Sequence, residues 1–142
     1  MTISKLELIE GGIASDHRGS VRFANRLPLG EFVRFYSIAN KEPHVVRGWH
    51  GHKFEAKAIV ALQGRISVGA VLVDNWENPD ASLEVHRFDL DWDSPSVVLI
   101  PGGYANAIMA LSEGAIAGVF SSSTLAESLD DDIRFSPDYW EL

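Results

Sequence analysis

The stretch Lys57–Val73, KAIVALQGRISVGAVLV, contains two apolar, β-branched runs separated by Gln63 and Gly64. Such runs favour strands because branched side chains pack well on a pleated surface, and a glycine between them favours a turn. The segment Leu62–Ile66 therefore predicts a tight hairpin between two core strands.

Similar short runs recur along the chain, and no segment shows a long apolar pattern at helical spacing. A helical turn is expected at residues 123–131. The chain is therefore predicted to be all-β, and this spacing of strands indicates a double-sheet jelly roll that holds a ligand in the mouth of its barrel. The further strands are expected at residues 32–38, 45–52, 83–90, 97–100 and 116–121.

Length, charge and composition narrow the classes of protein. The 142 residues fit one compact domain, taken as residues 1–142. No run approaches the roughly 20 apolar residues that cross a bilayer, and the N-terminus lacks a signal-peptide layout, so we expect a cytoplasmic protein with no membrane partner. The absence of cysteine excludes thiol chemistry. A net charge of −8 argues against nucleic acid, but arginines concentrate in the first third and favour a pocket for a small anion.

The segment Arg47–Lys53, RGWHGHK, carries two histidines between fixed cations. Alternation along a strand places His50 and His52 on one face and Trp49 on the other. Imidazole binds metals and also acts as a base near neutral pH. The pair therefore predicts either a metal site or a site that removes a proton from carbon.

A metal at this pair would require further ligands. Glu55 is the nearest carboxylate, but alternation places it on the opposite strand face unless a bulge intervenes. Asn106, at the end of Pro101–Asn106, is a poor transition-metal ligand beside imidazole. We therefore predict no bound metal and no cofactor, with a metal-dependent enzyme that uses His50, His52 and Glu55 as an alternative.

Several segments resemble the sugar-nucleotide branch of the cupins, namely the dTDP-4-dehydrorhamnose 3,5-epimerases and the dTDP-sugar 3,4-ketoisomerases. Asp16–Gly19 resembles their early Asp-x-Arg-Gly turn, and Phe32–Asn40 followed by Arg47–Lys53 resembles the ketoisomerase pattern. Glu55–Val60 and Ile100–Ala107 resemble the epimerase pattern. The resemblance covers most of the chain and implies a cupin-type jelly-roll barrel, a nucleotide-sugar substrate and a homodimer.

The resemblance also implies roles for individual side chains. The histidine that matches His50 removes a proton beside the C4 ketone, and the arginines that match Arg18 and Arg47 hold the diphosphate, which forked guanidinium groups suit. Lys57 matches a lysine near the sugar carbonyl, where a fixed cation stabilises an enolate. The other candidates are the proton carriers His52 and Tyr36 and the ligand contacts Trp49, Tyr104 and Asn106.

Two features of the epimerases are expected to be missing. Residues 120–127 contain no tyrosine to return a proton, and the chain stops before the segment that supplies an aspartate to the catalytic histidine. The acidic C-terminal stretch is predicted to be a solvated face. We predict a metal-independent isomerase or epimerase acting on a nucleotide-linked, dTDP-type 4-keto-6-deoxy sugar. A sugar-nucleotide-binding cupin that has lost the reaction is the alternative.

Overall fold

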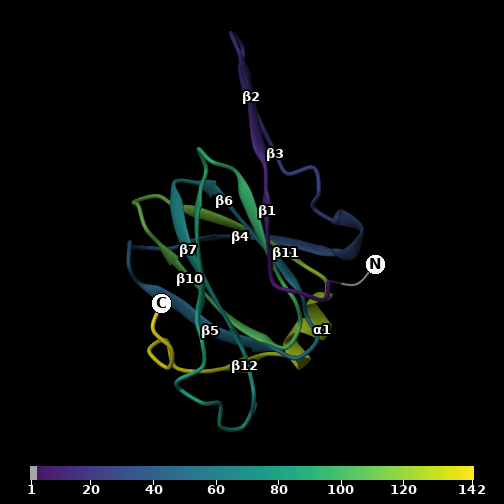
Figure 1. Cartoon of the computed structure of the whole chain (residues 1–142), viewed down its shortest axis with the longest axis vertical. Coiled ribbons are helices and arrows are strands. Elements are labelled where there is room, and N and C mark those ends of the chain that lie inside the picture. The colour runs from purple at the N-terminus through teal and green to yellow at the C-terminus, as the bar shows by residue number, and fades with distance from the viewer. Residues whose placement is uncertain (1–2) are drawn as a thin grey trace.

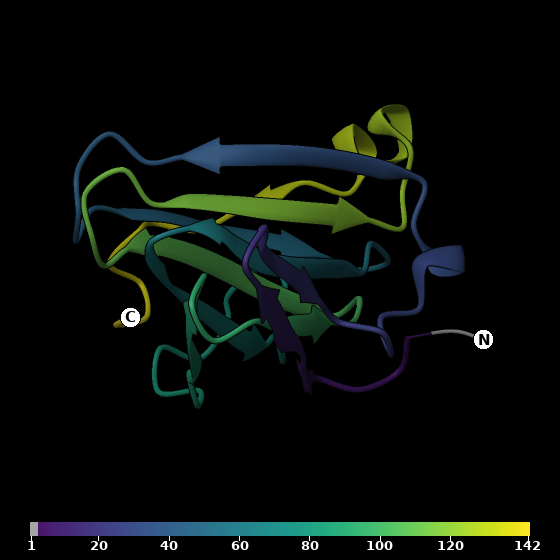
Figure 2. The same ribbon diagram turned by 90° about the horizontal axis from the view of Figure 1, so that it is seen from above.

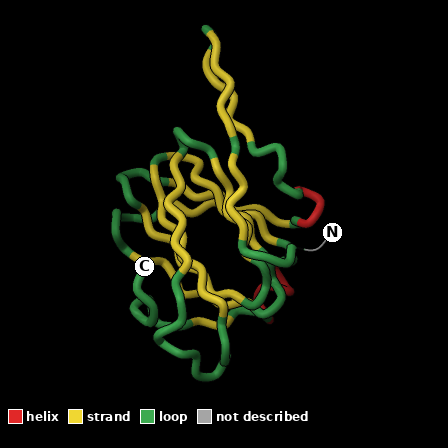
Figure 3. Tube along the Cα trace, viewed as in Figure 1, coloured by secondary structure: helices red, strands yellow, loops and turns green. Residues whose placement is uncertain are grey.

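Residues 3–142 are described by a computed structural model, in which two antiparallel five-stranded sheets form a barrel (Figure 1). The tube in Figure 3 shows the strands surrounding a common centre. The first sheet has the order β1 (Glu7–Glu10), β9 (Ser96–Ile100), β6 (Lys57–Gln63), β11 (Ile116–Ser121) and β4 (Arg34–Ala39). The second has the order β12 (Ile133–Arg134), β5 (Val46–His52), β10 (Tyr104–Ala110), β7 (Arg65–Leu72) and β8 (His86–Asp91). The all-β jelly-roll prediction is confirmed.

The remaining elements lie outside these sheets. Strands β2 (Gly12–Asp16) and β3 (Gly19–Phe23) pair only with each other, and Figure 1 shows them as an arm that projects from the barrel. A 3-10 turn spans Leu29–Glu31. Helix α1 (Leu125–Asp130) follows β11 and lies beside the ends of β4 and β11 in Figure 2. Within residues 3–142, no helix has the length and hydropathy that a membrane crossing requires.

The predicted hairpin at Leu62–Ile66 is wrong. Strand β6 pairs with β9 and β11, whereas β7 pairs with β10 and β8, so the chain passes from one sheet to the other at Gly64. Gly64 has a φ of 67°, which favours glycine, and Gln63 Nε2 donates to the carbonyl of Gly114 at 2.6 Å. Two consecutive apolar runs indicate two strands but do not show which strands they pair with. A turn that carries the chain from one sheet to the other has the same sequence pattern as a hairpin.

Side chains that point inward from both sheets form the main core. Ile59 and Val119 from the first sheet meet Val68 and Ile108 from the second, and each is less than 5% exposed. Burying such a side chain contributes roughly 1.5–3 kcal/mol. A second core covers the outside of the second sheet, where the C-terminal segment packs Trp140 against Trp49.

Polar residues replace apolar ones toward one end of the same strands. In the first sheet Lys57, Ser121 and Arg34 are register partners across β6, β11 and β4. In the second sheet His50 pairs with Asn106 across β5 and β10. The register of the two sheets thus gathers the polar inner side chains at one end of the barrel.

Candidate active site

An irregularity in β5 brings the histidine pair and Arg47 to the same side. The pairing of β5 with β10 shifts by one residue at Trp49, which is therefore the extra residue of a β-bulge. Arg47, His50 and His52 consequently all line one cavity. A regular strand would have turned Arg47 to the opposite face from His50, because side chains alternate along a strand.

The cavity has a volume of about 290 Å³. Its apolar lining includes Ile59, Ile108 and Val119, which belong to the main core. The rest is polar and mostly cationic, so the cavity suits a ligand that combines an apolar ring face with oxygen atoms and negative charge. The charged and titratable lining residues are Arg34, Tyr36, Arg47, His50, His52, Lys57, Asp132 and Arg134.

His52 is fixed by the segment that follows α1. Its Nδ1 lies 2.7 Å from the carbonyl oxygen of Asp131 and 3.2 Å from Oε1 of Glu55. Burial lowers the pKa of His52, with a further contribution from the charge of Lys57. The neutral imidazole is therefore favoured, although a carboxylate lies beside it.

His50 lies closer to the opening and has a weaker partner. Its Nδ1 is 4.0 Å from Oδ1 of Asp132, while Oδ2 of Asp132 accepts a hydrogen bond from Nε of Arg134 at 3.1 Å. Burial lowers the pKa of His50 to about 4, and the charges of Lys57 and Arg134 lower it further than Asp132 raises it. His50 is thus an unprotonated acceptor at neutral pH.

The predicted residues Lys57, Tyr36 and Asn106 also line the cavity. Lys57 is 8% exposed, and its Nζ lies 6.0 Å from the centre of the Tyr36 ring. Asn106 Nδ2 donates to the carbonyl of His50 at 3.4 Å, which ties β10 to the bulged part of β5. Lys57 supplies a buried cation facing two neutral imidazoles.

The structure does not bring Trp49, Tyr104 and Arg18 to this cavity. Trp49 is 0% exposed and its Nε1 donates to the carbonyl of Trp140 at 3.0 Å, because the indole lies on the face of β5 opposite His50 and packs in the second core. Tyr104 packs against the main core and is not among the cavity-lining residues. Arg18 lies in the turn of the β2–β3 arm, where its 79%-exposed side chain pairs with Asp16. No residue of the arm lines the cavity.

The acidic C-terminal stretch is only partly the solvated face that was expected: Asp130, Asp138 and Glu141 are exposed, whereas Asp131 and Asp132 are not. Asp131 is 8% exposed, and its carboxylate accepts hydrogen bonds from the backbone N–H groups of Lys53, Phe54 and Glu55 at 2.7–2.9 Å. Asp132 lines the cavity beside His50. Directly after α1, Asp132 thus places a carboxylate oxygen 4.0 Å from Nδ1 of His50, although the sequence was expected to lack a carboxylate there.

Glu55 reaches His52 although strand alternation predicted the opposite face. It follows β5 in the turn before β6, where alternation no longer holds, and it is 2% exposed. Its carboxylate accepts hydrogen bonds from Arg34 Nη2 at 3.1 Å, from Ser128 Oγ at 2.9 Å and from Ser121 Oγ. Residues 3–142 contain no group of three or more His, Asp or Glu side chains with metal-binding geometry.

The comparison with protein families assigns the chain to one of them. Residues 1–141 match the model described as FdtA: WxcM-like, C-terminal. The chain belongs to this WxcM-like family. A search of proteins with curated functions gave no match.

Solved structures with the same fold include enzymes whose names refer to TDP-linked sugars. The dTDP-4-dehydrorhamnose 3,5-epimerase from Bacillus anthracis has a TM-score of 0.74 at 21% identity, covering 93% of this chain and 81% of that one. The WlaRB TDP-quinovose 3,4-ketoisomerase from Campylobacter jejuni has a TM-score of 0.71 at 20% identity, covering 96% and 98%. A mutant of the 3,4-ketoisomerase QdtA from Thermoanaerobacterium thermosaccharolyticum, in complex with TDP-4-keto-6-deoxyglucose, has a TM-score of 0.69 at 19% identity, covering 97% and 93%. The cupin-type barrel is thereby confirmed.

Proposed function

We propose that this protein is an isomerase or epimerase that acts on a nucleotide-linked 4-keto-6-deoxy sugar by removing a proton from the carbon next to the ketone. The observation that carries the proposal is the placement of His50, His52 and Lys57 around one cavity. The names of the structural neighbours support the substrate class, since they include 3,4-ketoisomerases and 3,5-epimerases of TDP-sugars.

His50 is the base in this proposal. It is neutral because burial and neighbouring cations lower its pKa, so its ring nitrogen is free to accept a proton from carbon. As the C–H bond breaks, its electron pair forms a carbon–carbon double bond and negative charge moves to the ketone oxygen. The buried ammonium of Lys57 stabilises that charge, and the phenol of Tyr36 is placed to donate a proton. These residues need no metal for the step.

The arginines hold the anionic part of the substrate. Arg47, Arg134 and Lys57 line the cavity and make it cationic, although the chain as a whole has a net charge of −8. Guanidinium groups suit a diphosphate because they bind its oxygens in two-point contacts. A cavity of about 290 Å³ is near the lower end of the ligand-site range, so it suits the sugar, with the nucleotide extending through the opening.

Solvent deuterium exchange tests this function. Purified protein is incubated with TDP-4-keto-6-deoxyglucose in deuterium oxide and followed by NMR. We expect deuterium at a carbon next to the ketone and the appearance of an isomeric sugar. A protein that binds the sugar nucleotide while introducing no deuterium and forming no isomeric sugar would instead be the non-catalytic binder.

A homodimer is part of the same proposal. Val33, directly before β4, and Phe35, within it, are 65% and 53% exposed, and Phe35 lies against Phe120 on the outer face of the first sheet. Exposed apolar side chains on this face suit an interface with a second copy of the chain. A cytoplasmic location remains the prediction made from the sequence.

A further inference from the structure

The hydrogen bonds of His52 define which of its nitrogens carries the proton. Both neighbours of Nδ1, the Asp131 carbonyl at 2.7 Å and the Glu55 carboxylate at 3.2 Å, are acceptors. Nδ1 must therefore be the protonated nitrogen, because a carbonyl oxygen has no proton to donate. In the neutral ring, Nε2 is left as a lone-pair acceptor.

That lone pair has no partner within the described part of the protein. His52 is 4% exposed and lines the cavity, and its Nε2 is buried without a hydrogen bond from any of residues 3–142. Leaving a buried polar atom unpaired costs about 1–3 kcal/mol, so such atoms in a cavity indicate the ligand group they receive. The complement of an unprotonated imidazole nitrogen is a hydrogen-bond donor, and the donors that a sugar carries are its hydroxyl groups.

The Glu55 carboxylate lies where it would stabilise a protonated His52. Its buried carboxylate accepts from Arg34, Ser121 and Ser128, which fix its orientation, and its Oε1 faces Nδ1 of His52. An imidazolium formed by protonation at Nε2 would lie directly against this carboxylate. The arrangement is that of a carboxylate, an imidazole and a hydroxyl, in which the carboxylate orients the base and stabilises its charged form.

We propose that His52 takes the proton of the sugar hydroxyl next to the ketone, and that Glu55 and the Asp131 carbonyl are its positioning groups. This inference rests on the proposed function and specifies the reaction: it assigns the protein to 3,4-ketoisomerisation. Epimerisation breaks and remakes only C–H bonds, so it has no use for a base directed at a hydroxyl. Ketoisomerisation must also move a proton from one sugar oxygen to the next.

The proton movements balance over one cycle. His50 removes the proton from carbon 3, the C–H electron pair forms the C3–C4 double bond, and oxygen 4 takes a proton from Tyr36 or Lys57 to give an enediol. His52 Nε2 then takes the proton from oxygen 3, the O–H electron pair forms the new C3 carbonyl, and the electron pair of the C3–C4 double bond takes the proton held by His50 to form the C4–H bond. The proton on His52 returns through solvent to the group that protonated oxygen 4.

The test separates the carbon step from the oxygen step. Wild-type protein and the His52→Gln variant are incubated with TDP-4-keto-6-deoxyglucose in deuterium oxide, and NMR follows both deuterium at carbon 3 of recovered substrate and formation of the 3-keto sugar. Glutamine accepts a hydrogen bond but takes no proton. We expect ketoisomer formation to fall by about 100-fold or more while deuterium entry is largely retained, since losing a general base costs about 10²–10⁴.

Two further variants distinguish positioning from structural damage. Glu55→Gln keeps the size and the hydroxyl contacts but removes the charge, and is expected to lower ketoisomer formation about tenfold relative to deuterium entry. Glu113→Gln, in an exposed turn, is the matched control and is expected to change neither rate. Equal loss of both rates in His52→Gln, or undiminished ketoisomer formation, would overturn the inference.

The inference and the proposed function fail in different ways. Wild-type protein that introduces deuterium at carbons 3 and 5 without making the 3-keto sugar would overturn the inference and leave an epimerase. Wild-type protein that introduces no deuterium and makes no 3-keto sugar would overturn both. Should Glu55→Gln fail to fold, the His52 tautomer is still measurable in wild-type protein by nitrogen-15 NMR, and a proton found on Nε2 in the free protein would contradict the inference.

Discussion

The imidazoles of His50 and His52 line one cavity, but they have different neighbours. His52 is held from behind by Asp131 and Glu55 and presents Nε2 inward, whereas His50 lies nearer the opening beside Asp132 and Arg134. Cations and burial keep both rings neutral, so both are ready to accept protons. A negatively charged substrate would relieve the unfavourable charge around His50 as it binds.

The pKa of His50 predicts the acid limb of the rate profile. His50 is active when unprotonated, and burial with the charges of Lys57 and Arg134 lowers its pKa from 6.5 to about 4. We expect kcat/KM, which reports on the free enzyme, to stay level as the pH falls below 6.5 and to drop only near pH 4. In Arg134→Gln a cation is lost, so the limb should move to higher pH. A wild-type limb near 6.5 would contradict this account of His50.

Lys57 has a matched control four residues earlier. We expect Lys57→Met to lower kcat about 100-fold or more, because a buried cation that meets charge developing in the transition state is worth about 10²–10³. TDP affinity should change much less, since the arginines remain. Lys53→Met removes an exposed lysine in the turn between β5 and β6 and should leave kcat unchanged. Equal effects of the two changes would show that Lys57 acts only through overall charge.

Among individual residues, the sequence predicted the strand residues that line the cavity better than the residues from the C-terminal segment that lie beside them. His50, His52, Lys57, Tyr36, Arg47 and Asn106 were predicted, and the structure places all six around the cavity. Asp132 and Arg134 were missed because they come from the far end of the chain and reach the site through tertiary packing. The cluster of acids at residues 130–132 could have indicated that Asp132 lies at the site, but such a run of acidic residues is more typical of a solvated face.

The segment after α1 ties the C-terminal part of the chain to the turn between β5 and β6. Asp131 accepts three backbone hydrogen bonds through its side chain and one from His52 through its carbonyl. Helix α1 ends directly before it and begins with a capping box between Thr124 and Glu127. This element thus positions His52, Glu55 and Asp132 together.

Removing the Asp131 carboxylate should destabilise the protein. Asp131→Ala leaves three N–H groups without their acceptor, at a cost of about 3 kcal/mol, given roughly 1–3 kcal/mol for each buried unpaired group and partial access of water. Urea unfolding followed by circular dichroism measures the change. Asp130→Ala, which alters the exposed neighbour, should be close to neutral. Equal stability of the two variants would show that the turn does not depend on this carboxylate.

Strand prediction failed where strands are polar or built from small residues. The arm strands β2 and β3 were missed because their mixed, exposed side chains lack alternation. Strand β10 was missed because Ala105 and Ala107 carry little apolar signal, yet both are 0% exposed and lie beneath Trp49 in the second core. Apolar strands such as β11, by contrast, were predicted within a residue or two.

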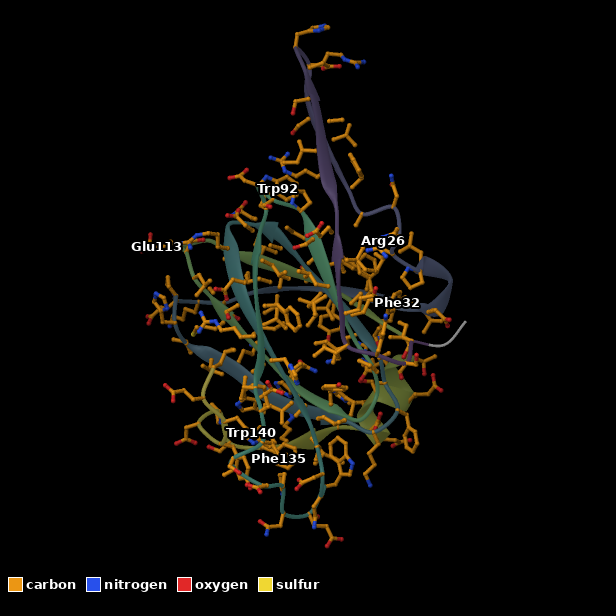
Figure 4. The ribbon with its side chains drawn as sticks, in the orientation of Figure 1. Arg26, Phe32, Trp92, Glu113, Phe135 and Trp140 are labelled. Carbon is orange, nitrogen blue, oxygen red and sulfur yellow. The ribbon has the colours of Figure 1, made fainter. Side chains whose placement is uncertain are left out.

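As a whole, the molecule is acidic with a cationic cavity at one end of its barrel. The net charge is −8, yet Arg34, Arg47, Lys57 and Arg134 line the cavity. Such a field draws small anions toward the opening and repels nucleic acid. The opposite part of the barrel is closed by its core, and the arm projects near Trp92, as Figure 4 shows.

The oligomeric state should depend on the outer face of the first sheet. We expect the wild-type chain to elute as a dimer in size-exclusion chromatography with light scattering, and Phe35→Glu to elute as a monomer because it places charge in an apolar contact. Phe54→Glu is the control: Phe54 is 82% exposed and lies in the turn after β5. Wild-type protein that is monomeric at high concentration would contradict the dimer.

The most direct test of the central claim is the initial rate at which the protein introduces solvent deuterium next to the ketone of TDP-4-keto-6-deoxyglucose, measured for wild type and His50→Gln. His50→Gln should be slower by about 100-fold or more, the contribution expected of a general base, while still binding TDP. A variant as fast as wild type would show that His50 is not the base and that the cavity performs different chemistry.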